Sequence, residues 1–311
     1  MDYAIETRGL TKRFKSALAV DNIDMRVPQG CICGFLGKNG AGKTTTIRML
    51  AGLRRPTAGT ISIMGEPQTV DGSSKFGYLP DVPNFYNYMR GDEYLMLISK
   101  IWHMDKDEAK SRIGQLLMTV GLGGVKTRIG GYSRGMKQRL GIAQALINNP
   151  QVIFMDEPVS ALDPIGRRDI ANIIHNLRGA TVILSTHIMA DVENICDYIV
   201  IMDKGRICAQ DYISNLMAEH AKNAAKIRFF DAAAADKFFG RITDHGVLFA
   251  DRESEIAMRL GSASLPRDEI SSLCSRLLVE LNLPCEYFNA EGATLEEIFY
   301  NAIGEGERMH A

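Results

Sequence analysis

A glycine-rich loop follows a short apolar run near the start of the 311-residue chain. It reads Gly37-Lys38-Asn39-Gly40-Ala41-Gly42-Lys43-Thr44, which fits the pattern G-x-x-x-x-G-K-[ST]. Glycines let the backbone N–H groups of such a loop wrap around phosphate oxygens. The lysine then reaches the β- and γ-phosphates, and the threonine hydroxyl is offered to Mg²⁺. The loop therefore predicts a binding site for ATP and Mg²⁺, to which we also assign the next residue, Thr45.

An acidic pair follows a second apolar run. Residues 152–155 are all apolar and lead directly into Asp156 and Glu157. A carboxylate at the end of a buried strand beside a phosphate loop is well placed to hold Mg²⁺ through water, the role that we predict for Asp156. Glu157 is then the candidate that polarises the attacking water. The alternative is a strand-end carboxylate with no chemical role.

Alternating strands and helices must hold these segments together. Apolar runs predict strands at 32–36, 152–155, 182–184 and 198–202, and the pattern after the loop predicts a helix over 44–53 and a strand over 59–64. Short strands are expected before residue 30. Residues 82–150 are expected to be a helical insertion, with an apolar stripe formed by Ile113, Leu116, Leu117 and Val120. This order predicts an α/β core with a largely parallel sheet.

A second, smaller domain is expected after the core ends near residue 217. Residues 218–225 are rich in Ala and Lys and are predicted to be a linker. Over 226–311 the pattern predicts strand, helix, two strands, helix, strand and a last helix. The βαββαβ order is the ferredoxin-like arrangement. This predicted domain carries no catalytic signature.

Composition excludes several other classes. The 36 basic and 37 acidic residues leave a net charge of −1, so no nucleic-acid partner is expected. The six cysteines form no C-x-x-C pair, which argues against a zinc site and fits free thiols in a reducing cytoplasm. No apolar run approaches the ~20 residues of a membrane span, and the N-terminus lacks the apolar stretch of a signal peptide.

Three further motifs occur in a fixed order around the acidic pair. Residues 132–139, Tyr-Ser-Arg-Gly-Met-Lys-Gln-Arg, precede the pair, and residues 160–163, Ser-Ala-Leu-Asp, and 185–187, Ser-Thr-His, follow it. Taken alone, the motif at residues 132–139 is typical of a helix start that is capped by a serine. With the phosphate loop and the acidic pair, the series resembles the ATP-binding cassette family over residues 1 to about 217. The resemblance implies a P-loop NTPase core with an antiparallel β subdomain and an inserted α-helical subdomain, beside the 226–311 domain.

The family pattern implies roles for further residues. Phe14 stands where an aromatic ring stacks on adenine, with a core phenylalanine as the alternative. Ser133 and Gly135 contact the γ-phosphate of ATP bound to a partner subunit, and Asp163 lies where a loop crosses the dimer interface. His187 is expected to hydrogen-bond the γ-phosphate. The implied catalytic residues are Glu157, His187 and Asp81, and the implied metal-binding residues are Thr44, Asp81 and Asp156.

Several positions depart from that pattern. Asp81 replaces the usual glutamine at the hinge between core and insertion, so an ionised side chain there can bind a metal but cannot donate a hydrogen bond. The family's signature sequence takes the form L-S-G-G-Q. Arg134 replaces its first glycine and Met136 its glutamine, and Val159 stands where threonine is common. This variant resembles the stand-alone cassettes that serve type-2 exporters of drugs, peptides, lipids or polysaccharides.

The resemblance also implies partners. Both half-sites are complete in one chain, which makes a homodimer the economical arrangement. A separate membrane permease is expected, with the chain cytoplasmic and peripheral at the inner face of the cell membrane. The aromatic residues Phe85, Tyr86 and Tyr88 are the predicted docking groove, and a solvent-facing loop is the alternative.

Two rival hypotheses stay open. A cassette protein that acts on ribosomes or DNA would be of another class, but such proteins usually carry two cassettes or a long coiled coil, and this sequence has neither. The C-terminal domain is either a regulatory or dimer-stabilising module or a passive extension.

Overall fold

The computed structural model describes residues 2–15, 17–68, 76–160, 162–177, 179–219, 224–245, 248–252, 254–261, 267–291 and 294–308. Ala161 and half of the predicted linker, residues 220–223, lie outside these ranges. The chain divides into two compact units, one from the N-terminus to Ile213 together with residues from Ala302 onward, and one over Ser214–Asn301. The predicted domains, 1–217 and 226–311, therefore have slightly different limits from the compact units.

A six-stranded sheet forms the centre of the first unit. Its strands lie in the order β11-β10-β4-β9-β8-β7. Their bounds are Arg206–Tyr212, Tyr198–Asp203, Ile32–Leu36, Thr181–Thr186, Val152–Asp156 and Phe76–Leu79. Every neighbouring pair is parallel except β10 and β11. The largely parallel sheet is the one that the sequence predicts, and it brings the carboxyl ends of β4, β8 and β9 side by side.

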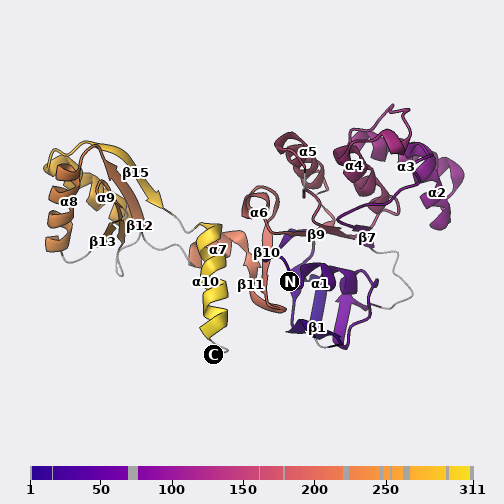
Figure 1. The fold of residues 1–311 in the computed structure, drawn as a ribbon, viewed down its shortest axis with the longest axis horizontal. Helices are drawn as coiled ribbons and strands as arrows, with labels where there is room; N and C mark the ends of the chain where they lie inside the picture. Colours follow the sequence, from indigo (N-terminus) through magenta and orange to yellow (C-terminus); the bar gives the residue numbers. More distant parts are fainter. Residues whose placement is uncertain are drawn as a thin grey trace. The chain divides into compact units, whose positions relative to one another are not determined.

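An antiparallel sheet belongs to the same unit. Its order is β2-β1-β5-β6, and β3 also pairs with β1. The bounds are Ala17–Ile23, Tyr3–Phe14, Ala58–Ile63, Glu66–Pro67 and Arg26–Pro28. Figure 1 shows this sheet and α1, Lys43–Leu50, on the side of the central sheet opposite to α4 and α5.

Both faces of the central sheet are buried at β4, β8, β9 and β10, which explains why these strands are largely apolar. Ile153 and Met155 of β8 pack into one core with the helical insertion, while Val152 and Phe154 pack into the other with α1 and the antiparallel sheet. Cys33 of β4 belongs to the second core and is fully buried. Burial also raises the pKa of Cys31, in the same core, to about 12, so this thiol stays protonated at neutral pH.

The helical insertion lies between β7 and β8. It contains α2, Gly91–Ile101, α3, Lys106–Thr119, and α4, Arg134–Ala145. Asp105 caps α3 by accepting hydrogen bonds from the backbone N–H groups of Asp107 and Glu108, and Ser133 caps α4. The central sheet also carries α5, Pro164–His175, which has a proline in its first turn, and α6, Met189–Ile195. Among the described residues, no helix is long and apolar enough to cross a membrane.

The second unit has one four-stranded antiparallel sheet in the order β13-β14-β12-β15. Its elements run from β12, Ala224–Phe229, through α8, Ala232–His245, β13, Phe249–Arg252, β14, Ala257–Gly261, and α9, Arg267–Glu280, to β15, Cys285–Glu291. Phe229, Phe238 and Ile270 are fully buried in its core, so both helices pack on one face of the sheet. The division between the units falls at the first residue of α7, Ile213–Glu219, and within α10, Leu295–Arg308.

Candidate active site

The phosphate loop connects the end of β4 to the start of α1. Gly40 and Gly42 have φ angles of +83° and +108°, which side chains rarely tolerate. A Cβ atom on Gly37 would lie 2.3 Å from the carbonyl oxygen of Met202, and one on Gly42 would lie 2.5 Å from that of Ala19. Neighbouring strands therefore force the loop into its conformation. Lys43, Thr44 and Thr45 form the first turn of α1, while Lys38, Asn39 and Gly40 are exposed.

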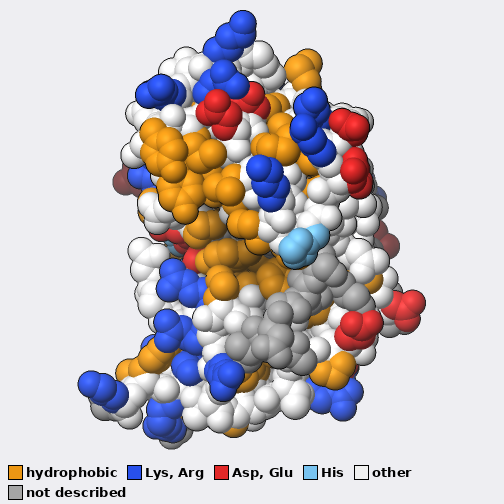
Figure 2. Space-filling view, turned by 90° about the vertical axis from the view of Figure 1, so that its right-hand side faces the viewer, with side chains coloured by type: hydrophobic (Ala, Val, Ile, Leu, Met, Phe, Trp, Pro, Cys, Tyr) orange, Lys and Arg blue, Asp and Glu red, His pale blue; other side chains and the backbone are white. Residues whose placement is uncertain are grey.

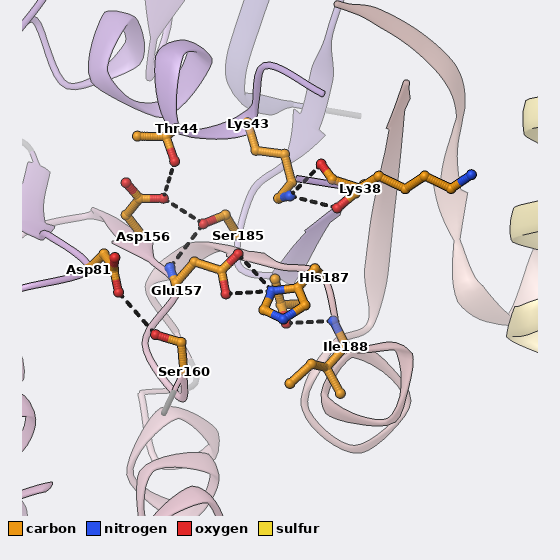
Figure 3. A network of polar contacts seen from close by, with 12 residues as sticks. Lys38, Lys43, Thr44, Asp81, Asp156, Glu157, Ser160, Ser185, His187 and Ile188 are labelled. Atoms are coloured by element: carbon orange, nitrogen blue, oxygen red, sulfur yellow. Dashed lines mark hydrogen bonds and ion pairs between the residues drawn. The ribbon is translucent and has the colours of Figure 1, made fainter. Parts of the chain in front are cut away.

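The Lys43 ammonium group is folded back onto the loop. It is 6% exposed and donates hydrogen bonds to the carbonyl oxygens of Gly37, at 2.6 Å, and Lys38, at 3.1 Å (Figure 3). Burial lowers its pKa, and the negative charges of Glu157 and Asp156 oppose that effect. A buried cation held only by carbonyl dipoles gains most from an anionic ligand, which is what a phosphate supplies.

Asp156 stands at the end of β8 and joins three elements. Its Oδ1 atom accepts hydrogen bonds from the hydroxyls of Thr44, at 2.9 Å, and Ser185, at 2.8 Å. Its Oδ2 atom is buried and accepts no hydrogen bond from the described residues. An orphaned carboxylate oxygen beside the phosphate loop fits the donor set that Mg²⁺ takes, with phosphates and water completing the shell. Among the described residues, no group of three or more His, Cys, Asp or Glu side chains is arranged to hold a metal ion.

Glu157 follows Asp156 in a left-handed conformation, with φ of +50°. Its backbone N–H donates to the Ser185 hydroxyl at 2.9 Å, and both its carboxylate oxygens face His187 Nδ1, at 3.1 and 2.9 Å. His187 directly follows β9, Thr181–Thr186, and satisfies this pair when Nδ1 carries the proton. A non-glycine residue at positive φ costs of order 1 kcal/mol and is characteristic of functional sites.

Asp81 lies just beyond β7 on the same side of the sheet. Its Oδ1 atom accepts a hydrogen bond of 3.0 Å from the Ser160 hydroxyl, and it makes no hydrogen bond with Thr44 or Asp156 (Figure 3). The residue that departs from the family pattern is thus held by the segment that leads to Asp163, which caps α5 by accepting from Gly166 N–H at 2.8 Å.

Phe14 ends β1 and is 36% exposed. The guanidinium carbon of Arg54 lies 5.0 Å from its ring centroid, and Lys12 Nζ lies 5.5 Å away. Both distances allow cation–π attraction. The ring is therefore at the surface and accessible for stacking, unlike the core phenylalanine of the alternative hypothesis.

Ser133 and Gly135 belong to a different surface. With Leu162 and Asp163 they line a groove of about 340 Å³ beside α5. None of the residues that contact Asp156 or Glu157 lines this groove. Ser133 Oγ accepts a hydrogen bond from Met136 N–H at 3.2 Å, as a helix cap does.

The structure thus brings together Lys43, Thr44, Asp156, Glu157 and His187, with Asp81 beside them, and leaves Ser133 and Gly135 outside this network. Sequence reasoning assigned no role to Ser160 or Ser185, although both connect predicted site residues. For Ser185, the available signal was a polar residue directly after the apolar run 182–184 of β9.

We expect Gly42→Ala to weaken ATP binding at least tenfold, because the added Cβ meets the Ala19 carbonyl and the φ angle is unfavourable. Titration with a fluorescent ATP analogue measures the affinity. Gly65→Ala is the matched control, since Gly65 has φ of +80° but nothing within 4 Å of its added Cβ. Equal affinities of the two variants would contradict the steric argument.

Comparison with known proteins agrees with this geometry. Residues 20–160 match the model of the family described as ABC transporter. The chain is 40% identical over 229 residues to the bacitracin transport ATP-binding protein BcrA of Bacillus licheniformis, covering 71% of this chain and 74% of that protein. It is 31% identical over 309 residues to the daunorubicin/doxorubicin resistance ATP-binding protein DrrA of Streptomyces peucetius. This match covers 97% of this chain and 92% of that protein.

Among solved structures, the chain resembles an ATP-binding subunit of an ABC transporter with a TM-score of 0.62 and 30% identity, covering 70% of this chain and 92% of that one. The likeness therefore extends to the fold of the cassette that carries the phosphate loop. The chain belongs to the ATP-binding subunits of ABC transporters, and it is an ATPase.

Proposed function

We propose that two copies of this chain close around ATP and Mg²⁺ and drive export through a separate membrane permease. The observation that carries the proposal is the division of the predicted ATP site between two surfaces. The phosphate loop, Asp156 and Glu157 form one network, while Ser133 and Gly135 line a groove that none of them reaches. A second subunit that presents its groove to this network would complete the site.

Residues of this chain provide a physical basis for both phosphate binding and hydrolysis. Lys43 exchanges the carbonyls of Gly37 and Lys38 for phosphate oxygens, which are stronger acceptors for an ammonium group. Glu157 polarises the attacking water, and His187, now paired with Glu157, turns to donate to the γ-phosphate. Both residues are therefore paired with each other until ATP arrives.

Mg²⁺ is proposed to bind through the Thr44 hydroxyl and the free Oδ2 atom of Asp156, the latter through water. A threonine hydroxyl can donate its hydrogen to Asp156 Oδ1 and still offer a lone pair to the metal. When bound, the ion neutralises charge that develops on the phosphates. Asp81 is a further proposed metal-binding side chain, since its bond to the Ser160 hydroxyl uses only Oδ1.

Bound ATP then holds the two subunits together, and its hydrolysis lets them separate. ATP bound in one subunit would contact the groove of the other, so it stabilises the closed dimer over the open one. Phe14 contributes a ring on which adenine can stack. Arg54, which now lies over this ring, is either displaced by adenine or stays on the opposite face of the ring. Asp163 is proposed to lie at the subunit boundary.

The permease is proposed to dock on the insertion. Tyr86 and Tyr88 are 52% and 68% exposed, and their rings lie 5.8 Å apart. Figure 2 faces the side that carries α2 and shows hydrophobic side chains gathered there, bordered by Lys and Arg side chains. Phe85 is more buried and packs edge-on against Tyr94, whose ring also lies 6.4 Å from that of Tyr86. Exposed aromatic residues are the usual anchors of protein interfaces.

The names of two relatives support the proposal of export. Their names assign bacitracin transport to one and daunorubicin/doxorubicin resistance to another. We extend to this chain the export of an unidentified compound and a peripheral position at the inner face of the cell membrane. The βαββαβ order of the second unit, with sheet order β13-β14-β12-β15, supports a ferredoxin-like accessory domain.

Purification from membranes tests the proposal. The tagged chain is expected to retain a polytopic membrane protein, and Tyr88→Asp is expected to lose it because a charge enters an apolar contact. Val279→Asp, which changes an exposed apolar residue on α9, is the control. Retention of ribosomes or DNA, with ATPase stimulation by either, would instead favour the rival class.

A further inference from the structure

A serine with no assigned role lies at the centre of the ATPase network. Ser185 is on β9, paired in register with Asp156 of β8 on one side and Phe35 of β4 on the other. It is fully buried. A buried hydroxyl is costly unless its hydrogen-bonding capacity is used, so its partners explain why a serine stands in this apolar strand.

The Ser185 hydroxyl acts both as a hydrogen-bond donor and as an acceptor. Ser185 donates to Asp156 Oδ1 at 2.8 Å and accepts from the backbone N–H of Glu157 at 2.9 Å (Figure 3). With the Thr44 hydroxyl, which also donates to Asp156 Oδ1, the bonds form a continuous chain from α1 to the residue after β8. One side chain on β9 therefore contacts both acidic residues.

The bond to Asp156 determines which carboxylate oxygen stays free. Two hydroxyl donors saturate Oδ1 and leave Oδ2 buried without a partner among the described residues. Without Ser185 only Thr44 would hold the carboxylate, and the carboxylate group could rotate to exchange its two oxygens. The position of the free oxygen would then no longer be fixed toward the metal.

The bond to Glu157 holds the backbone in an unfavourable conformation. Glu157 has φ of +50°, and left-handed conformations persist only where neighbouring groups stabilise them. The Ser185 hydroxyl is the hydrogen-bond partner of the Glu157 N–H group. Loss of that partner would let Glu157 relax and move its carboxylate relative to His187.

We infer that Ser185 is a positioning residue for ATP hydrolysis, which fixes the Asp156 carboxylate and the Glu157 backbone without touching the nucleotide. The inference rests on the proposed roles of Asp156 and Glu157. It predicts an effect on turnover and on Mg²⁺ dependence that exceeds any effect on ATP binding.

The test compares three single variants by steady-state kinetics at several Mg²⁺ concentrations. Ser185→Ala is expected to lower kcat about 10- to 100-fold, since two buried partners lose their bonds, and to raise the Mg²⁺ concentration needed for half-maximal rate. The KM for ATP should stay within about twofold of wild type. Ser185→Thr keeps the hydroxyl and is expected to restore most of kcat; Ser185→Cys replaces Ser185→Ala if that variant does not fold.

Thr181→Val is the matched control. Thr181 lies on the same strand, is nearly fully buried, and accepts a hydrogen bond from Gly30 N–H at 2.9 Å, outside the site. It should lose stability as Ser185→Ala does but retain kcat. Equal kcat values in the two variants, or no rescue by threonine, would overturn the inference. If Glu157→Gln keeps wild-type turnover, the proposed function fails instead, so the two failures are distinguishable.

Discussion

Replacing Glu157 with glutamine is expected to lower ATP turnover at least about 100-fold and to leave ATP bound between two subunits. Glutamine has the shape of glutamate and can keep a hydrogen bond to His187, but its amide cannot polarise water as a carboxylate does. Binding should survive because Lys43 and the loop glycines are unchanged. Gel filtration with ATP and Mg²⁺ measures the dimer, and phosphate release measures turnover.

The control for this variant is Glu193→Gln, which removes an exposed carboxylate from α6 outside the hydrogen-bonded network. It should behave as the wild type in both measurements. Wild-type turnover in Glu157→Gln would refute the role proposed for Glu157. A catalytically dead variant that stays monomeric with ATP would refute the dimer while leaving the hydrolytic role intact.

The phosphate loop could be predicted from sequence because all its requirements are local. Glycines at fixed spacing, one lysine and one threonine specify the turn and its ligands, and the structure gives Gly40 and Gly42 the positive φ angles that only glycine adopts readily. The central strands were also predictable. A strand buried on both faces must be apolar throughout, as residues 152–155 are.

Element ends were less predictable. Short strands were expected before residue 30, but β1 is a single strand, Tyr3–Phe14. It contains register shifts in its pairing with β2 and β5, and Gly9 has φ of +59°. Irregularities of this kind change which side chains face the core, so the alternation breaks although the strand continues. The predicted helix over 44–53 ends at Leu50, because Gly52 adopts φ of +65° and closes the last turn.

The bonds between site residues could not be predicted because they join distant segments. Thr44 and Asp156 are 112 residues apart, and Asp81 and Ser160 are 79 apart. Neither spacing has a local signature. The left-handed conformation of Glu157 is also invisible in sequence, since glutamate has no preference for it and the Ser185 hydroxyl on another strand stabilises it.

Mixing two inactive variants tests whether the ATP site is shared between subunits. Lys43→Gln removes the cation of the phosphate loop but keeps N–H donors for the Gly37 carbonyl. Gly135→Asp places a carboxylate where the γ-phosphate of the partner's ATP is expected. Its Cβ would lie 3.9 Å from Leu162, so the variant acts through charge and the fold is preserved. The ATPase activity of each variant alone should be at least about 100-fold lower than that of the wild type.

In the mixed dimer, one site combines both defects and the other is intact. An equal mixture should therefore recover about a quarter of wild-type activity, since half of the dimers are mixed and each has one working site. The matched control mixes Lys43→Gln with a chain that carries both Lys43→Gln and Gly135→Asp, in which no intact site can form. Because the two substitutions affect separate surfaces, recovery can arise only if Ser133 and Gly135 act on ATP held by the other subunit. A mixture no more active than its components would mean that each chain holds a whole site.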